Sequence, residues 1–164
     1  MKTFKDAQGR EWKIAINIGA AKRIREKLDG ADMLQPEVGD HPFLTRIGTD
    51  IAFLAEVLCE LLIDQFEANG VTEQMMGDVF DGEVLIAAQM ALYEDLVNFF
   101  QALGRIDRAS AVTKQMAIQK AAFRMGSEKI ENLNAETEVT KVFNRIDGKM
   151  SGDSPESSDS SPTA

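Results

Sequence analysis

Three carboxylates recur at every fourth position of one apolar segment: Glu56, Glu60 and Asp64. Residues four apart share a helix face, and inward carboxylates on such faces bind pairs of iron or manganese ions when Glu-x-x-His pairs complete the ligand set. The single histidine, His41, instead precedes a proline in a segment without helical period. We therefore predict no metal site, and we interpret the three acids, with Glu67, as the solvated stripe of an otherwise apolar helix.

A nucleophilic centre is the second chemistry that these residue types allow. Cys59 or Ser110, with His41 and Asp50, has the composition of a catalytic triad, but no Gly-x-Ser-x-Gly turn accompanies them. Cys59 lies among leucines, which is typical of a buried small apolar residue and not of a reactive thiolate. A lone cysteine has no partner for a disulfide or a Cys/His metal site, and no glycine-rich phosphate-binding motif occurs. The sequence therefore predicts no catalytic residue, no cofactor and no metal.

Basic side chains between residues 105 and 129 form a candidate nucleic-acid surface. They are Arg105, Arg108, Lys114, Lys120, Arg124 and Lys129. Their spacing is too irregular for one helix face, and few aromatic residues lie among them to stack on bases. The acidic remainder of the chain repels phosphates. We therefore predict a solvated or intersubunit face and no nucleic-acid partner.

Charge is segregated along the 164 residues. Residues 30–104 hold one basic and fourteen acidic side chains, whereas residues 1–29 have a balance of +4 and residues 105–149 of +3, within a net charge of -9. Blocks of opposite sign attract one another within a chain or between subunits, and a simply solvated acidic face is the alternative. Charges also interrupt every apolar run before the roughly 18 residues of a membrane span, and no signal-peptide pattern is present. We expect a cytoplasmic protein with no membrane partner.

Two short strands are predicted at residues 3–5 and 11–17, around a turn in which Gly9 can adopt a positive φ. In the second strand Trp12, Ile14 and Ile16 alternate with polar residues, so these three should face the core. Asn17 then offers an N-cap for a short amphipathic helix over 18–28. No other segment has the pattern of a strand.

Helices are predicted for most of the remaining chain. After a loop at 29–41, Pro42 opens a helical region, and Thr49 or Asp50 caps a long helix ending at 69–70. A short helix follows from Thr72 to Phe80, and longer helices cover 83–100 and 105–130, with a weaker segment reaching 146. The predicted fold is mainly α, a small helical bundle with an N-terminal β-hairpin at about 3–17. It forms a single domain over 1–146, followed by a disordered Ser-rich tail at 147–164.

The segments 50–66 and 83–100 are apolar around most of the helix circumference. A surface helix needs only one apolar stripe, so both are buried on two sides. They form the central pair of a bundle, or they leave apolar surface for an oligomer or a client protein. The candidate protein-binding residues on these segments and on the methionine-containing turn between them are Met75, Met76, Phe80, Leu92, Leu96, Phe99 and Phe100.

Three runs resemble small proteins from the tail-gene region of phages and prophages. They are FKDAQGREWKIAIN at 4–17 with the helix at 20–28, VTE at 71–73, and DLVNFF at 95–100, so the resemblance covers about residues 3–130. The chain resembles the tail assembly chaperones of long-tailed (siphovirus-type) phages. No catalytic residue carries over, because this family has none.

That resemblance implies a non-enzymatic chaperone that binds the hydrophobic tape-measure protein and helps the tail tube to assemble. Its implied partners are tape-measure and tail-tube proteins and further copies of itself, in the cytoplasm of the bacterial host, and it would be absent from the mature virion. In some members a longer form arises by translational frameshifting near the end of the reading frame. Two other functions remain open: an acidic phage-encoded inhibitor of a host nucleic-acid enzyme, or a minor structural tail or head-completion protein.

Overall fold

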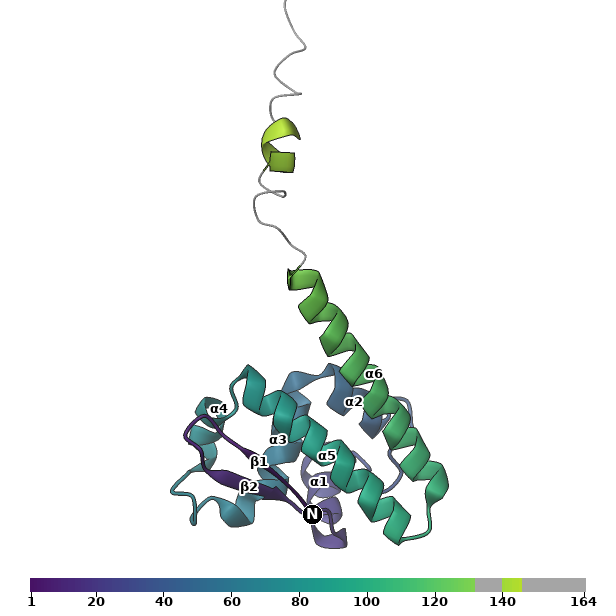
Figure 1. Cartoon of the computed structure of the whole chain (residues 1–164). Coiled ribbons are helices and arrows are strands. Elements are labelled where there is room, and N and C mark those ends of the chain that lie inside the picture. The colour runs from purple at the N-terminus through teal and green to yellow at the C-terminus, as the bar shows by residue number, and fades with distance from the viewer. Residues whose placement is uncertain (132–139, 146–164) are drawn as a thin grey trace, which may run out of the picture. The chain divides into compact units, whose positions relative to one another are not determined.

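The computed structural model describes residues 1–131 and 140–145 (Figure 1). The chain divides into two compact units, Met1–Ala121 and Ala122–Ala164, so the predicted domain 1–146 spans the boundary between them. Of the weak helical segment predicted to reach residue 146, residues 140–145 are described and form a helical turn. The predicted disordered tail, 147–164, lies outside the described residues.

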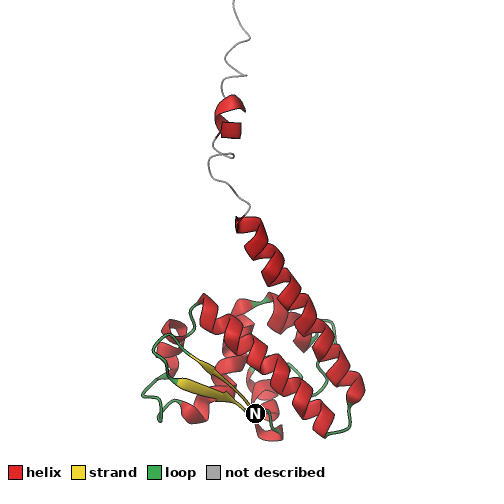
Figure 2. Cartoon of the chain, in the orientation of Figure 1, coloured by secondary structure: helices red, strands yellow, loops and turns green. Residues whose placement is uncertain are grey.

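The described residues are mainly helical, with one β-hairpin near the N-terminus (Figure 2). This confirms the predicted fold class. Strands β1 (Lys2–Lys5) and β2 (Glu11–Ile14) pair antiparallel with Phe4 opposite Trp12. At the turn, the Asp6 carboxylate accepts the backbone N–H groups of Gln8 and Arg10, and Gly9 has a φ of 78°. A positive φ costs glycine nothing and strains other residues.

Strand β2 ends at Ile14, three residues before the predicted end at 17. The next inward residue, Ile16, donates its backbone N–H to a carboxylate on a helix, so it has no place in a strand ladder. The predicted inward face is confirmed, because Trp12, Ile14 and Ile16 are all buried. Helix α1 (Ile18–Lys27) begins where predicted, and the Asn17 side chain caps it by accepting the Ala20 N–H at 2.9 Å.

Helices α2 (Phe43–Thr49) and α3 (Ile51–Leu62) meet at Asp50, which caps α3 as predicted by accepting the Phe53 N–H at 3.0 Å. The prediction that this helix continues to 69–70 is wrong. A 3₁₀ turn, η1 (Ile63–Gln65), follows α3 directly. There the Gln65 side chain accepts from Lys13 N at 2.8 Å and donates to Lys13 O at 2.7 Å. This contact with the outer edge of β2 accompanies the end of the helix.

The second half of the chain follows the predicted boundaries to within about two residues. A 3₁₀ turn, η2 (Glu73–Met75), leads into α4 (Met76–Val79), and α5 (Gly82–Ala102) begins at the N-cap Asp81. Gly104, with a φ of 70°, separates α5 from α6 (Ile106–Glu131).

Helix α5 lies at the centre of the first unit. The hairpin packs along it, mainly through β1, and α3 contacts both α5 and β2 (Figure 1). Cover on several sides explains why α5 is apolar around most of its circumference. Helix α3 is enclosed in the same way by α1, α2, α5 and β2. The two helices therefore form the central pair of the bundle. In the described part of the chain, no helix is both long and apolar enough to cross a bilayer.

Candidate functional site

The predicted solvated stripe of acids on α3 is wrong at Glu60. Glu56 and Asp64 are exposed, but Glu60 is only 8% exposed, and its Oε1 accepts from Lys27 Nζ at 2.7 Å. Helix α1 packs against α3 and brings Lys27 over this carboxylate. Sequence periodicity places Glu60 on the right helix face, but it cannot reveal that another helix covers that face.

A second cation from α1 completes this arrangement. Arg23 donates from Nη2 to the backbone carbonyl of Glu60 at 3.2 Å and lies 3.7 Å from the Asp64 carboxylate. Glu60 of α3 thus pairs with a lysine and Asp64 of η1 with an arginine. Among the described residues, no group of three His, Cys, Asp or Glu side chains is arranged to hold a metal ion.

The four residues of the candidate triad do not come together as a nucleophilic centre. Asp50 serves as the cap of α3, and His41 is exposed in the 29–41 loop beside it. Cys59 is half-buried on α3. Its burial, and then the negative charges of Glu73, Glu60 and Glu56, raise the pKa of its thiol to about 11. Cys59 is therefore protonated at neutral pH, the state in which a thiol is a poor nucleophile.

An acidic hollow lies between the 29–41 loop and α2. It has a volume of about 560 Å³, and its lining includes four aspartates, one histidine and one arginine: Asp29, Asp32, Asp40, Asp50, His41 and Arg46. The Arg46 guanidinium stacks on the ring of Phe53, 3.6 Å from its centroid. Sequence analysis missed this hollow because its acids are scattered through a loop without a periodic pattern.

The seven candidate protein-binding residues separate into two groups. Met76, Leu92, Leu96 and Phe100 are at most 2% exposed and belong to the core of the first unit. They cannot contact a partner in this fold, because the hairpin and neighbouring helices already cover them.

The other three reach the surface to different extents. Phe80 and Phe99 are half-buried, with Phe80 beside Phe4 and Phe99 beside Phe100. Only Met75 is largely open, at 44% exposure. The predicted docking surface is thus reduced to Met75 with partial contributions from two phenylalanines.

The largest exposed apolar side chains of the described second unit lie elsewhere. Met125 and Ile130 on α6, and Val142 and Phe143 on the turn at 140–145, are between 56% and 71% exposed. None of the side chains described in 122–164 is buried. Sequence analysis missed these four residues because the segments that carry them are more polar than α3 and α5, and only the structure shows that they lack cover.

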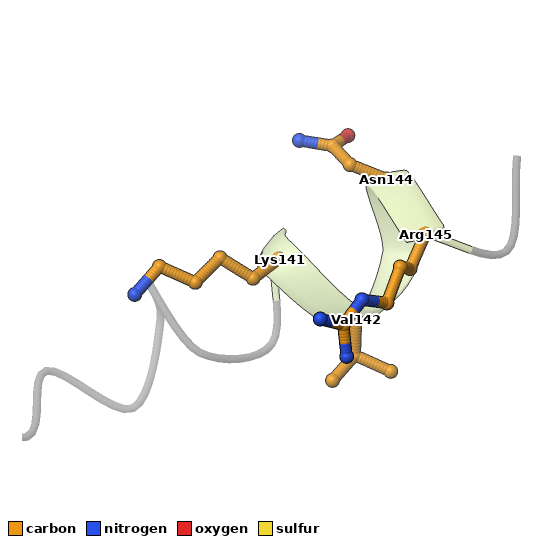
Figure 3. Close-up of a pocket in the computed structure, with 4 residues that line it drawn as sticks. All are labelled: Lys141, Val142, Asn144 and Arg145. Atoms are coloured by element: carbon orange, nitrogen blue, oxygen red, sulfur yellow. The ribbon is translucent and has the colours of Figure 1, made fainter. Parts of the chain in front are cut away.

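The turn at 140–145 also lines a shallow hollow of about 440 Å³ (Figure 3). Its lining residues are Lys141, Val142, Asn144 and Arg145. In Figure 3 the side chains of Lys141 and Asn144 diverge from the turn, and those of Arg145 and Val142 overlap in this view. Two cations and one apolar side chain on a single turn do not form a binding pocket for a small molecule.

The predicted basic residues do not form one strip. Arg105 pairs with Asp107 at 2.8 Å, and Arg124 lies 3.7 Å from Glu128. Arg108 is half-buried, donates to the carbonyl of Leu34 and lies 3.7 Å from Glu37. Lys114, Lys120 and Lys129 remain exposed.

No protein-family model, no curated protein and no solved structure matches this chain. The class of the molecule therefore rests on its own architecture. It is a mainly helical protein with an N-terminal hairpin, an acidic hollow beside α2, and exposed apolar side chains in its second unit.

Proposed function

We propose that the chain is a non-catalytic, protein-binding chaperone of phage tail assembly, which binds the tape-measure protein and assists assembly of the tail tube. The observation that carries this proposal is the exposure of Met125, Ile130, Val142 and Phe143 in a unit with no buried side chain among its described residues. Apolar side chains without cover gain free energy when a partner removes them from water. The resemblance to tail assembly chaperones supplies the identity of the partner.

The chemistry of the second unit is suited to a helical client. Met125 and Ile130 are exposed on α6, and methionine adapts to partners of different shape. Lys129 on the same helix provides charge for an acidic partner group. The protein would act as an oligomer in the host cytoplasm and leave the particle before its completion.

Co-expression of the full chain with a hydrophobic helical segment of a tape-measure protein tests this proposal. We expect a soluble complex with the unchanged chain and loss of most captured segment with Ile130→Glu, because the new charge opposes burial against an apolar partner. Ser127→Glu is the matched control, since it adds the same charge at an exposed position of α6. If both variants captured equal amounts of the segment and had unchanged circular dichroism spectra, α6 would not be part of the binding surface.

A second function is favoured by the acidic hollow. Four aspartates around one concavity can mimic a row of phosphates, so an inhibitor of a host nucleic-acid enzyme would present this face. Replacement of Asp40 and Asp32 by Asn would then abolish inhibition of the enzyme, whereas it would leave capture of the tape-measure segment intact.

A minor structural role in the tail or head is distinguished by particle composition. A structural protein persists in purified particles, while an assembly chaperone is absent from them. Mass spectrometry of purified particles therefore separates these two functions.

A further inference from the structure

The first half of α6, residues 106–121, has few apolar contacts with the rest of the first unit. Ala109 and Val112 are its buried apolar side chains, and Ala111 and Met116 are partly buried. Alanine and valine are small, so the apolar area that this half-helix removes from water is modest compared with that of α3 or α5.

Polar groups make up much of the remaining contact. Gln119 is buried and donates from Nε2 to the carbonyl of Gly48 at 2.6 Å. Gln89 of α5 donates in the same way to the carbonyl of Ile47, also at 2.6 Å. Both carbonyls lie near the C-terminal end of α2, where a helix leaves its last carbonyls without internal partners. Glutamine side chains therefore tie the end of α2 to α5 and to α6.

Gly48 leaves room for the glutamine amides of α6. A Cβ atom added there would lie 2.4 Å from Gln119 Nε2, 2.7 Å from Gln115 Nε2 and 3.3 Å from the Tyr93 hydroxyl. Gly48 lies inside α2 and does not have a positive φ. A side chain there would therefore have to displace the amide ends of these two flexible glutamine side chains, and the backbone conformation would not oppose it.

Two further polar groups are buried along this half-helix. The Tyr93 hydroxyl lies beside the amides of Gln115 and Gln119, whose interaction with it opposes the effect of burial on its pKa. Nε of Arg108, at the start of α6, is buried with Glu37 3.7 Å away, beyond hydrogen-bond distance, so its burial opposes docking. Burial also raises the pKa of Tyr93 to about 12.

We propose that residues 106–121 of α6 form a releasable strap, which detaches from the first unit while the hairpin, α3 and α5 stay folded. A small buried apolar area and the buried Arg108 Nε, which has no hydrogen bond, make its opening less costly than global unfolding. Arg108 links the strap to the 29–41 loop through the carbonyl of Leu34 and through Glu37. The loop therefore loses two contacts when the strap opens. This inference does not depend on the proposed chaperone function.

Hydrogen–deuterium exchange of the full chain, resolved by peptide, tests the strap. We expect amides of 106–121 to exchange through a local opening that leaves α3 and α5 protected. In Gly48→Ala, exchange of the strap should accelerate on the order of tenfold, because the added methyl group displaces the Gln119 amide from its hydrogen bond to the Gly48 carbonyl. Alanine also has the higher helix propensity, so α2 itself should not be weakened.

Gly77→Ala is the matched control. Gly77 is helical, in α4, and a Cβ there meets no atom within 4 Å, so strap exchange should not change. Exchange of 106–121 together with α3 and α5, in one cooperative step, would overturn the proposal. So would Gly48→Ala if it left strap exchange unchanged or accelerated exchange equally throughout the first unit.

Discussion

The carboxylate of Asp95 accepts a hydrogen bond from the backbone N–H of Ile16 at 2.8 Å. Asp95 is buried in the middle of α5, and Ile16 lies just beyond β2. The other oxygen of Asp95 is 2.5 Å from the amino group of Met1. One buried acid thus holds both outer ends of the hairpin strands against the central helix, in addition to the apolar contacts of Phe4 and Trp12.

Removing the acceptor at position 95 should weaken this attachment. Asp95→Leu leaves the Ile16 N–H buried without a partner, and we expect the free energy of unfolding to fall by about 1–3 kcal/mol. Asp95→Asn keeps an acceptor oxygen, so its free energy of unfolding should fall by less. Urea unfolding of the two variants measures the difference, and equal stability of both with the unchanged chain would show that this hydrogen bond contributes nothing.

Glu60 provides the second prediction. Replacing a buried, ion-paired carboxylate by an amide weakens its bond to Lys27, so Glu60→Gln should lower the free energy of unfolding by about 1 kcal/mol. Lys27 is half-exposed and can turn to water, which limits the loss. Glu56→Gln, one turn earlier and exposed, should change stability by less than about 0.5 kcal/mol. Thermal unfolding measures both variants, and equal stability of the two would show that the ion pair of Glu60 with Lys27 contributes nothing.

Local signals made much of the fold predictable. The caps at Asn17 and Asp50, the turn at Gly9 and the break at Gly104 each depend on residues within a few positions of one another. Period-two alternation likewise placed Trp12 on the covered face of the hairpin. Such features depend on the backbone geometry of a few neighbouring residues, so the residue types in that short segment are enough to predict them.

The errors all involve partners far along the chain. Helix α3 stops early at a contact between Gln65 and Lys13, which is 52 residues away in sequence, and Glu60 is buried beneath a lysine 33 residues away. Periodicity also could not show which apolar faces are covered. The candidate binding residues Leu92 and Leu96 lie in the core, whereas Ile130 is exposed.

The third prediction concerns the reactivity of Cys59. Since its pKa is raised to about 11 from 9.0, the thiolate fraction at neutral pH is about 100-fold lower than for an unperturbed cysteine. Alkylation by iodoacetamide in the folded protein should therefore be slow and should increase with pH up to about 11. A rate that levels off between pH 8 and 9 would contradict this environment.

The lowered pKa of Asp6 makes the stability of the fold depend on pH, with the higher stability at neutral pH. Burial alone would raise its pKa, but hydrogen bonds from Trp12 and Arg10 favour the carboxylate and hold the pKa below 3.8. The unfolded-state pKa of an aspartate is about 3.9, so the lowered pKa of Asp6 stabilises the folded protein at any pH above that value. This stabilisation is lost as the pH falls through the lower, folded-state pKa. Asp6→Asn should therefore be less stable than the unchanged chain at pH 7, by about 1.5–3 kcal/mol.

The difference in free energy of unfolding between the unchanged chain and Asp6→Asn should become smaller as the pH drops below about 4. Protonation of Asp6 then removes the negative charge that the asparagine variant lacks at every pH. Chemical unfolding at pH 7, 5 and 3 measures it. A stability difference that stays constant over this range would show that the charge of Asp6 does not contribute.

Light scattering of the full chain with and without a tape-measure segment, across a salt series, tests the proposed function most directly. Unlike charge blocks on neighbouring copies attract one another, and salt screens exposed charges beyond about 8 Å at physiological ionic strength. We expect assemblies larger than the 18.1 kDa monomer that loosen as salt rises, and a soluble complex with the segment at every salt concentration. A strict monomer that neither binds the segment nor keeps it soluble would contradict the chaperone function.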